Sequence, residues 1–326
     1  MDILKAMKRL VHLLFYIVLV SCATEATPLS PTQTVPTELL PTSTVRTEQI
    51  TNYQLPTVEP SRTRRPTPIG LPTLTATATF LPGVTPTASD DWKSLPVIPV
   101  VDSSVRDIYE YGQTLGNDPY AFSIFGDCQS RPEEFFGVFE TDPEFVSTLS
   151  PDLQEAVANF QGSFNRESPT SPDGTTPGSL LWAAWHQGEF TCSFAETPVE
   201  CELRIHRPSF VIIQVGTHFE SRNTEYLRRI ILQLMDAGVV PILATKADNR
   251  EKDERINRDM SMLAAEYDLP LWNFWAAVSD LPERGLYTRS DRPLQGPIYL
   301  TEEATAIHRM TGLAALNAVW RVVTNP

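Results

Sequence analysis

Short apolar runs that alternate with helix-like segments constrain the fold of this chain most strongly. The runs Tyr120–Phe125, Phe210–Val215 and Val239–Ala244 consist almost wholly of apolar residues, which is typical of strands buried on both faces of a parallel sheet. Helical periodicity separates them, and in Thr224–Ala237 the apolar residues share one face, with Gly238 as the C-terminal cap. The alternation predicts an α/β fold: a three-layer sandwich in which a flavodoxin-like parallel sheet has helices on both faces.

The remaining segments extend this pattern. We expect helices over Ser104–Leu115, Asp152–Phe160 and Glu254–Tyr267, and a short strand over Leu269–Phe274. A last helix is expected from residue 301 to about residue 323, because acidic residues occupy its first turn.

The N-terminus predicts export. Three basic residues precede an apolar stretch, Leu10–Val20, which is short for a membrane span and leads directly into Ser21-Cys22. This arrangement resembles a bacterial lipoprotein signal, in which the cysteine, here Cys22, is lipidated and becomes the mature N-terminus. We therefore expect residues 1–22 to be a signal peptide and the acyl chains to anchor the protein to the outer face of the cell membrane. The alternative, an uncleaved signal anchor, also places the domain outside the cytoplasm.

Residues 23–90 are rich in Thr, Pro and Ser and have almost no periodic apolar pattern. Such a segment cannot bury enough apolar surface to offset its ordering entropy, so we expect a disordered, extended linker. Its dense Thr and Pro also resemble an O-glycosylated stalk. Residues 91–326 suit one folded domain with a sizeable core. The net charge of −14, without a basic stripe, argues against nucleic acid as a partner.

The four cysteines divide by position. Cys22 is assigned to the lipid. Cys192 and Cys201 bracket a polar loop, Ser193–Glu200, in an exported protein, which predicts a disulfide. No residue pair with metal-ligand spacing lies nearby, so we expect no metal site, and no other feature indicates a cofactor. Cys128 is left unpaired, either as a small buried hydrophobe or as a nucleophile or its relic.

Polar residues follow each of the three main strands. Gly126-Asp127-Cys128 follows the first, Gly216-Thr217-His218 the second, and Thr245-Lys246-Ala247-Asp248-Asn249 the third. Ligand sites in open α/β sheets gather at the carboxyl ends of the strands, so we expect these tips to share one pocket. Lys246 and Asp248 either line its rim or form an ion pair that caps the strand.

In order and spacing, these motifs resemble the SGNH (GDSL-type) hydrolases, and within them a subgroup of exported proteins with Cys in place of the usual Ser. The resemblance covers Tyr120–Trp320. It implies that Cys128 stands at the nucleophile position. It also implies that the Cys128 N–H, Gly174 and a third-block Asn form the oxyanion hole, and that an Asp and a His before the last helix supply the base and its orienter.

The chain departs from the family at most of these positions. His218 stands at the Asn position, Tyr299 at the His position and Gly296 at the Asp position, and the nearby Asp291 has Leu294, not His, three residues on. Losing one oxyanion-hole donor costs on the order of 3 kcal/mol of barrier, and losing the base costs more. A phenol is a poor base at neutral pH. The ordinary mechanism of the family therefore does not transfer to this chain.

Two hypotheses follow. In one, an esterase uses a Cys128 nucleophile with His218 as a relocated base; otherwise His218 only fills the Asn site. In the other, the domain is weak or inactive as an esterase and binds cell-envelope polysaccharide, with Trp272 and Trp275 either as a sugar-stacking platform or as core. The three substituted positions favour the second. We expect His308 to serve in packing or at the surface, and neither a substrate nor an oligomeric state can be read from the sequence.

Overall fold

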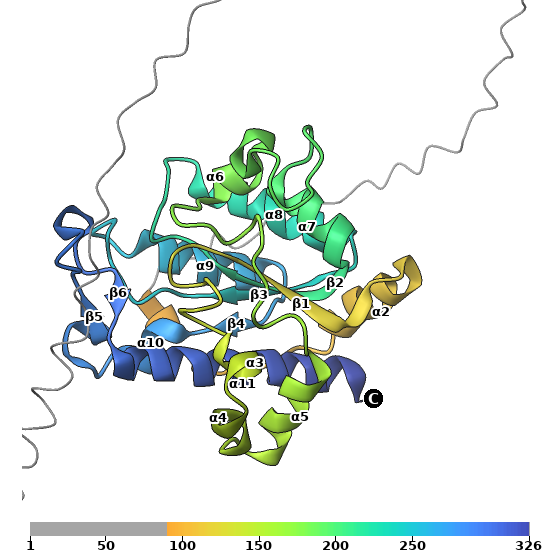
Figure 1. Ribbon diagram of the computed structural model, residues 1–326, viewed down its shortest axis with the longest axis horizontal. Coiled ribbons are helices and arrows are strands. Elements are labelled where there is room, and N and C mark those ends of the chain that lie inside the picture. The colour runs from red at the N-terminus through yellow and green to blue at the C-terminus, as the bar shows by residue number, and fades with distance from the viewer. Residues whose placement is uncertain (1–89, 326) are drawn as a thin grey trace, which may run out of the picture. The chain divides into compact units, whose positions relative to one another are not determined.

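The computed structural model describes residues 90–325 (Figure 1). The expected signal peptide, the lipidated Cys22 and the linker up to residue 89 lie outside the described residues. Between residues 90 and 325, no helix combines the length and the hydropathy needed to cross a bilayer.

A parallel four-stranded sheet forms the centre of the domain, in the order β1-β2-β3-β4. The strands are β1 (Asp118–Gly126), β2 (Pro208–Gln214), β3 (Val240–Ala244) and β4 (Leu271–Trp272). Because the strand order follows the chain, right-handed crossovers place helices from all three connections on one face, while part of the long connection between β1 and β2 lies on the other face. The predicted α/β architecture, with a parallel sheet between two helical layers, is confirmed.

Helices cover both faces of the sheet (Figure 1). One layer holds the crossover helices α6 (Pro177–Leu180), α7 (Pro198–His206), α8 (Asn223–Asp236) and α9 (Arg255–Glu266). The other holds α3 (Val138–Thr141), α4 (Pro143–Ser147), α5 (Pro151–Asn159), α10 (Phe274–Val278) and α11 (Glu302–Thr324). The remaining elements are α2 (Val105–Leu115), the 3₁₀ turns η1 (Asp90–Ser94), η2 (Ala183–His186), η3 (Pro282–Gly285) and η4 (Pro293–Gln295), and an antiparallel pair β5 (Leu286–Tyr287) and β6 (Tyr299–Leu300).

Two hydrophobic clusters hold these layers together. The cluster beneath the sheet is aromatic: the Phe122 ring packs edge-on against Phe136, Phe160 and Phe164, with centroids 4.9–5.8 Å apart. The cluster on the other face is mainly aliphatic and joins β2 to α8 and α9. Alternate residues of β2 point into the two clusters, which is why all seven residues of this strand are buried.

Irregular segments cover both outer edges of the sheet. Beside β1, the Phe122 N–H donates to Ser163 Oγ (3.3 Å) and the Gly126 N–H donates to Thr170 O (3.0 Å). Beside β4, the Asn273 N–H donates to Val97 O (3.0 Å). These N–H groups on the outer sides of β1 and β4 are therefore hydrogen-bonded although no further strand lies beside them.

Two of the regions for which the sequence made a prediction differ in the structure, which also contains short elements that were not predicted, such as α3, α4, β5 and β6. The expected polar loop ends in helix α7, because Thr197 and Glu200 form a capping box and Pro198 occupies the first turn. The expected strand Leu269–Phe274 is only the two-residue β4, because the Asn273 side chain accepts from the Ala276 N–H and starts α10. The other expected helices and strands are present, with ends shifted by a few residues.

Candidate functional site at the carboxyl end of the sheet

The tips of β1 and β2 lie at the same edge of the sheet. Phe125 pairs with Ile213 and Gly126 with Gln214, so the chain leaves both strands at one level. Gly216 then turns the second tip with φ of +136°, and a Cβ there would lie 2.4 Å from Ile256 Cγ2, so this position requires glycine. The predicted adjacency of the strands that carry Cys128 and His218 is confirmed.

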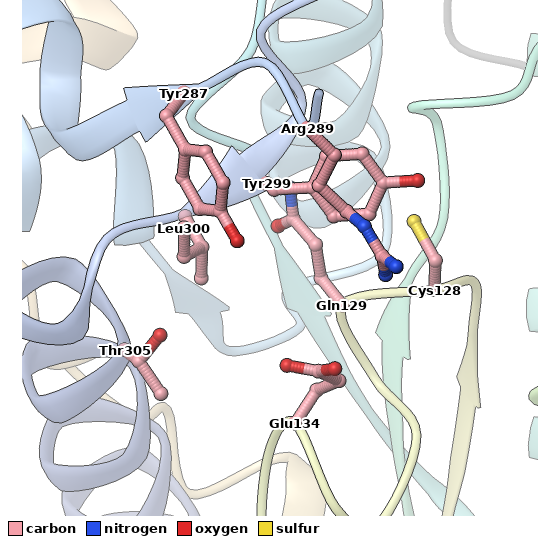
Figure 2. A pocket seen from close by; sticks show the side chains of 8 residues that line it. All are labelled: Cys128, Gln129, Glu134, Tyr287, Arg289, Tyr299, Leu300 and Thr305. Atoms are coloured by element: carbon pink, nitrogen blue, oxygen red, sulfur yellow. The ribbon is translucent and has the colours of Figure 1, made fainter. Parts of the chain in front are cut away.

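Cys128 lines a cavity of about 40 Å³ between the tip of β1 and the β5–β6 pair (Figure 2). Its walls are Cys128, Gln129, Glu134, Tyr287, Arg289, Tyr299, Leu300 and Thr305. In Figure 2 the Tyr299 ring, the Arg289 guanidinium and the Cys128 sulfur lie on one side of this space. A cavity of this volume has room for a water or two and is too small for a sugar ring.

The Cys128 thiol is held in its protonated form. The side chain is buried, and Sγ donates to Asp127 Oδ1 at 3.9 Å. Burial raises the pKa of Cys128 far above its ordinary value, and the carboxylates of Asp127, Asp173 and Asp248 raise it further. Each of these effects opposes the thiolate that a nucleophilic cysteine needs.

Asp127 is itself buried, at 2% exposure. Its Oδ1 accepts from the Gln129 N–H (3.4 Å), whereas Oδ2 has no hydrogen-bond partner among residues 90–325. Burial, and then the charge of Asp248, raise the pKa of Asp127 to about 7. A carboxyl group that is half protonated near neutral pH thus lies directly beside the thiol.

His218 lines a different cavity, of about 330 Å³. The other walls of this cavity are Gly174, Thr176, Thr217, Phe219 and Arg250. Arg250 Nη1 lies 3.3 Å from His218 Nδ1, and because a guanidinium can only donate, Nδ1 is an acceptor. Burial lowers the pKa of His218, and the positive charge of Arg250 lowers it further. The imidazole is therefore neutral at neutral pH.

These two environments bear on the hypothesis of a Cys128–His218 dyad. A thiolate–imidazolium pair needs the pKa of the cysteine lowered and that of the histidine raised, and both shifts run the other way. The closest polar partners are Asp127 for the thiol and Arg250 for the imidazole. The dyad stays a prediction, and the geometry gives it no support.

Tyr299, at the family's base position, shares the cavity of Cys128. Its hydroxyl donates to Gln295 Oε1 and accepts from Arg292 Nη1 (3.4 Å), and the Arg289 guanidinium lies 5.1 Å from its ring centroid. The phenol at the position where the resemblance implies a base is thus held by an amide and two arginines.

Lys246 and Asp248 form the ion pair that caps β3. Lys246 Nζ lies 2.8 Å from Asp248 Oδ1 and 2.6 Å from Glu251 Oε2, and all three side chains are buried. Thr217 Oγ1 donates to Asp248 Oδ2 (2.8 Å), which ties the β2 tip to the same cluster. Asn249 lines a further cavity of about 390 Å³. The part of Glu251 in this ion-pair cluster was not predicted from the sequence, although Glu251 and Lys246 lie in the same loop.

The remaining sequence candidates serve the core. Trp272 is fully buried and stacks on Phe135 (5.7 Å), so it offers no sugar platform. Trp275 packs edge-on against Trp92 (5.1 Å). His308 is buried with Nε2 bonded to the Gln214 side chain. Sequence reasoning missed Arg250, Arg289 and Arg292, because arginines in polar loops carry no local signal of what they face.

Cys192 and Cys201 form the predicted disulfide, which ties the start of α7 to the preceding loop. Cys128 is the free cysteine of the described residues, as expected.

No family model and no curated protein matches this sequence. Among solved structures, the chain is similar to a GDSL-like lipase from Bacteroides thetaiotaomicron VPI-5482, with 16% identity and a TM-score of 0.37 over 65% of this chain and 95% of the lipase. It is also similar to TesA, with 15% identity and a TM-score of 0.35 over 63% of this chain and 98% of TesA.

Proposed function

We propose that this protein is an exported, lipid-anchored binding domain with an SGNH-type fold, and that it binds polysaccharide of the cell envelope without hydrolysing it. The observation that carries the proposal is the separation of the two candidate catalytic groups: Cys128 and His218 line different cavities, and their polar partners are Asp127 and Arg250. The surroundings of Cys128 favour the thiol, and those of His218 favour the neutral imidazole. No activated nucleophile results at neutral pH.

The charges around Cys128 also disfavour the transition state of acyl transfer. Attack on an ester carbonyl develops negative charge on oxygen, which an active site stabilises with donors. Here the pKa of Cys128 responds to three acidic residues, Asp127, Asp173 and Asp248. An oxyanion beside the thiol would meet the same acidic groups, and the Arg289 guanidinium in this cavity is already paired with Asp291.

The neighbouring cavity supports binding. Its volume of about 330 Å³ falls in the range of small-ligand sites, roughly 300–1,000 Å³. Thr176, Thr217 and His218 supply hydrogen-bonding groups, and Phe219 supplies a ring. Such a mixture suits a sugar, which presents hydroxyl groups at its edge and C–H groups on its faces.

Hydrolysis is tested with 4-nitrophenyl acetate on the wild type, Cys128→Ala and His218→Ala. We expect no turnover above buffer in any of the three. Turnover that is lost in both variants would establish the esterase with a relocated Cys128–His218 dyad and overturn the proposal. Turnover that survives both changes would place an active site elsewhere and overturn it as well.

Binding is tested by calorimetry with neutral oligosaccharides and with polysaccharide purified from the producing cells. We expect binding to the wild type and a loss of affinity of about tenfold for His218→Ala, the size of a lost hydrogen bond to a desolvated group. Anchoring is tested by growing the producing cells with an alkyne-labelled fatty acid: the wild type should take up the label and Cys22→Ser should not. Wild-type protein without label would contradict the lipid anchor.

A further inference from the structure

Basic side chains gather around a third cavity, beside those of Cys128 and His218. It has a volume of about 390 Å³ and lies between the loop after β3 and the segment from η3 to β6. Three basic side chains line it, Arg250, Lys252 and Arg284, against one acidic side chain, Glu283. The rest of the wall is apolar or amide in character, from Leu286, Pro293, Leu294, Gln295, Pro297, Ile298 and Asn249.

These three cations differ from the other arginines at this edge of the sheet. Arg131 pairs with Glu133, Arg289 with Asp291, and Arg292 with Asp173. By contrast, within residues 90–325 no carboxylate forms an ion pair with Arg250, Lys252 or Arg284. In a chain of net charge −14, three uncompensated cations around one cavity are a local concentration of positive charge.

Neutral groups hold the two guanidinium groups in place. Arg250 Nη1 lies 3.3 Å from Thr217 O and 3.3 Å from His218 Nδ1. Arg284 Nε donates to Ala247 O at 2.6 Å. Carbonyl and imidazole acceptors orient a guanidinium without cancelling its charge, and they leave its other N–H groups for a ligand. Bidentate recognition of a carboxylate or phosphate needs this combination of fixed orientation and free donors.

The backbone that presents these residues is strained. Lys252 has φ of +75° on one side of the cavity, and Glu283 and Arg284 have φ of +49° and +53° on the other. Left-handed conformations in non-glycine residues cost of order 1 kcal/mol or more each and gather at ligand sites. Both walls of this cavity are built in this way.

We infer that this cavity binds an anionic group, a carboxylate or a phosphate, with Arg250, Lys252 and Arg284 as its ligands. Arg250 also lines the cavity of His218, so one extended ligand can occupy both. The source of the anion rests on the proposed function: it is an acidic polysaccharide, with a sugar in the His218 cavity and a charged substituent between the three cations.

Calorimetry on the full-length protein in detergent tests the inference. The probes are a hexamer of galacturonic acid, a poly(glycerol phosphate), neutral cellohexaose and inorganic phosphate. We expect the anionic probes to bind more tightly than cellohexaose and to lose affinity as salt rises, because the contacts are charged and partly exposed. Comparison of the first two probes distinguishes a carboxylate from a phosphate as the preferred anion.

The decisive variant is Lys252→Glu, with Arg229→Glu on the exposed side of α8 as a control that changes net charge equally. Lys252→Glu should weaken the anionic probes at least about tenfold, and the control should leave them unchanged. Arg284→Gln, checked by its melting temperature, serves as the second variant. Equal affinity for Lys252→Glu and wild type, or anionic binding indifferent to salt, would overturn the anion site.

The two proposals fail separately. If cellohexaose binds and the anionic probes bind no better, the polysaccharide-binding proposal stands and the anion site is wrong. If inorganic phosphate binds in a manner that depends on Lys252 and no saccharide binds, the anion site stands and the polysaccharide is not its ligand.

Discussion

Lys246 Nζ lies 2.6 Å from Glu251 Oε2 in the loop after β3, with both side chains buried. The same ammonium lies 2.8 Å from Asp248 Oδ1, so one cation compensates two carboxylates beneath the candidate site. Asp127 stands close enough for the charge of Asp248 to raise its pKa. The two buried carboxylates of this cluster therefore share Lys246 as their counter-charge.

Replacing Lys246 by Met should destabilise the protein by about 3–5 kcal/mol, because it leaves two buried carboxylates without a counter-charge. The free energy of unfolding, from denaturant titration, measures the effect. As a control, Arg222→Met breaks the exposed pair with Glu225 and should cost less than about 1 kcal/mol. Similar losses for the two variants would show that the buried cluster has no special role.

Asp127→Asn should make the protein more stable at pH 8 and leave its stability at pH 4 nearly unchanged. The folded-state pKa of Asp127 is raised from 3.8 to about 7, so between these values the folded protein holds a proton that the unfolded chain has released. Stability therefore falls as pH rises through this window and levels off above it. Asparagine does not ionise, so Asp127→Asn should keep the stability that the wild type loses in this pH range.

Melting temperatures of wild type and Asp127→Asn across pH 4–8 measure the effect of Asp127. The exposed Asp236→Asn on α8 is the control for the loss of one charge. The prediction is wrong if the difference between Asp127→Asn and wild type stays constant with pH.

The contribution of His308 to the pH dependence of stability should have the opposite sign to that of Asp127. Burial, and the charge of Arg309, lower the pKa of His308 from 6.5 to about 3. Below pH 6.5 the unfolded chain binds a proton that the folded protein excludes, so stability is lost as pH falls toward 3. His308→Gln keeps a polar partner for Gln214 and should show a shallower loss of melting temperature between pH 6.5 and 4. Parallel curves for the two proteins would contradict this.

The thiol chemistry is also testable. In the folded protein Cys128 should react with iodoacetamide much more slowly than after unfolding, because it is buried and its thiolate is disfavoured. Cys192 and Cys201 should react only after reduction. Mass spectrometry of the alkylated peptides gives all three rates. Rapid labelling of native Cys128 would argue against the protonated thiol and revive the nucleophile hypothesis.

Much of the fold could be predicted because its strands are continuous apolar runs. Phe210–Val215 can only be a strand buried on both faces, and the helix over Thr224–Ala237 follows from its spacing. Helix α7 was not predicted, because the polar residues of the capping box at its start are also typical of loops. The strand at β4 was predicted too long, because Asn273 caps α10 and ends the strand only in the folded protein.

The site was predictable only in part. The strand tips placed Cys128 and His218 at one edge of the sheet, and the family spacing placed Tyr299 beside the cysteine. The chemistry of these tips could not be predicted, because the pKa of Cys128 is raised first by burial and then by Asp127, Asp173 and Asp248, two of which come from other loops. The pKa of His218 is likewise lowered first by burial and then by Arg250.

The covered edges of the sheet affect whether copies of this domain aggregate. An exposed edge strand is a template on which a second molecule can add a strand, and such pairing starts aggregation. Ser163 and Thr170 take up the outward N–H groups of β1, and the segment at Val97 does the same beside β4. Copies of this domain can therefore crowd together at high density without their sheets joining.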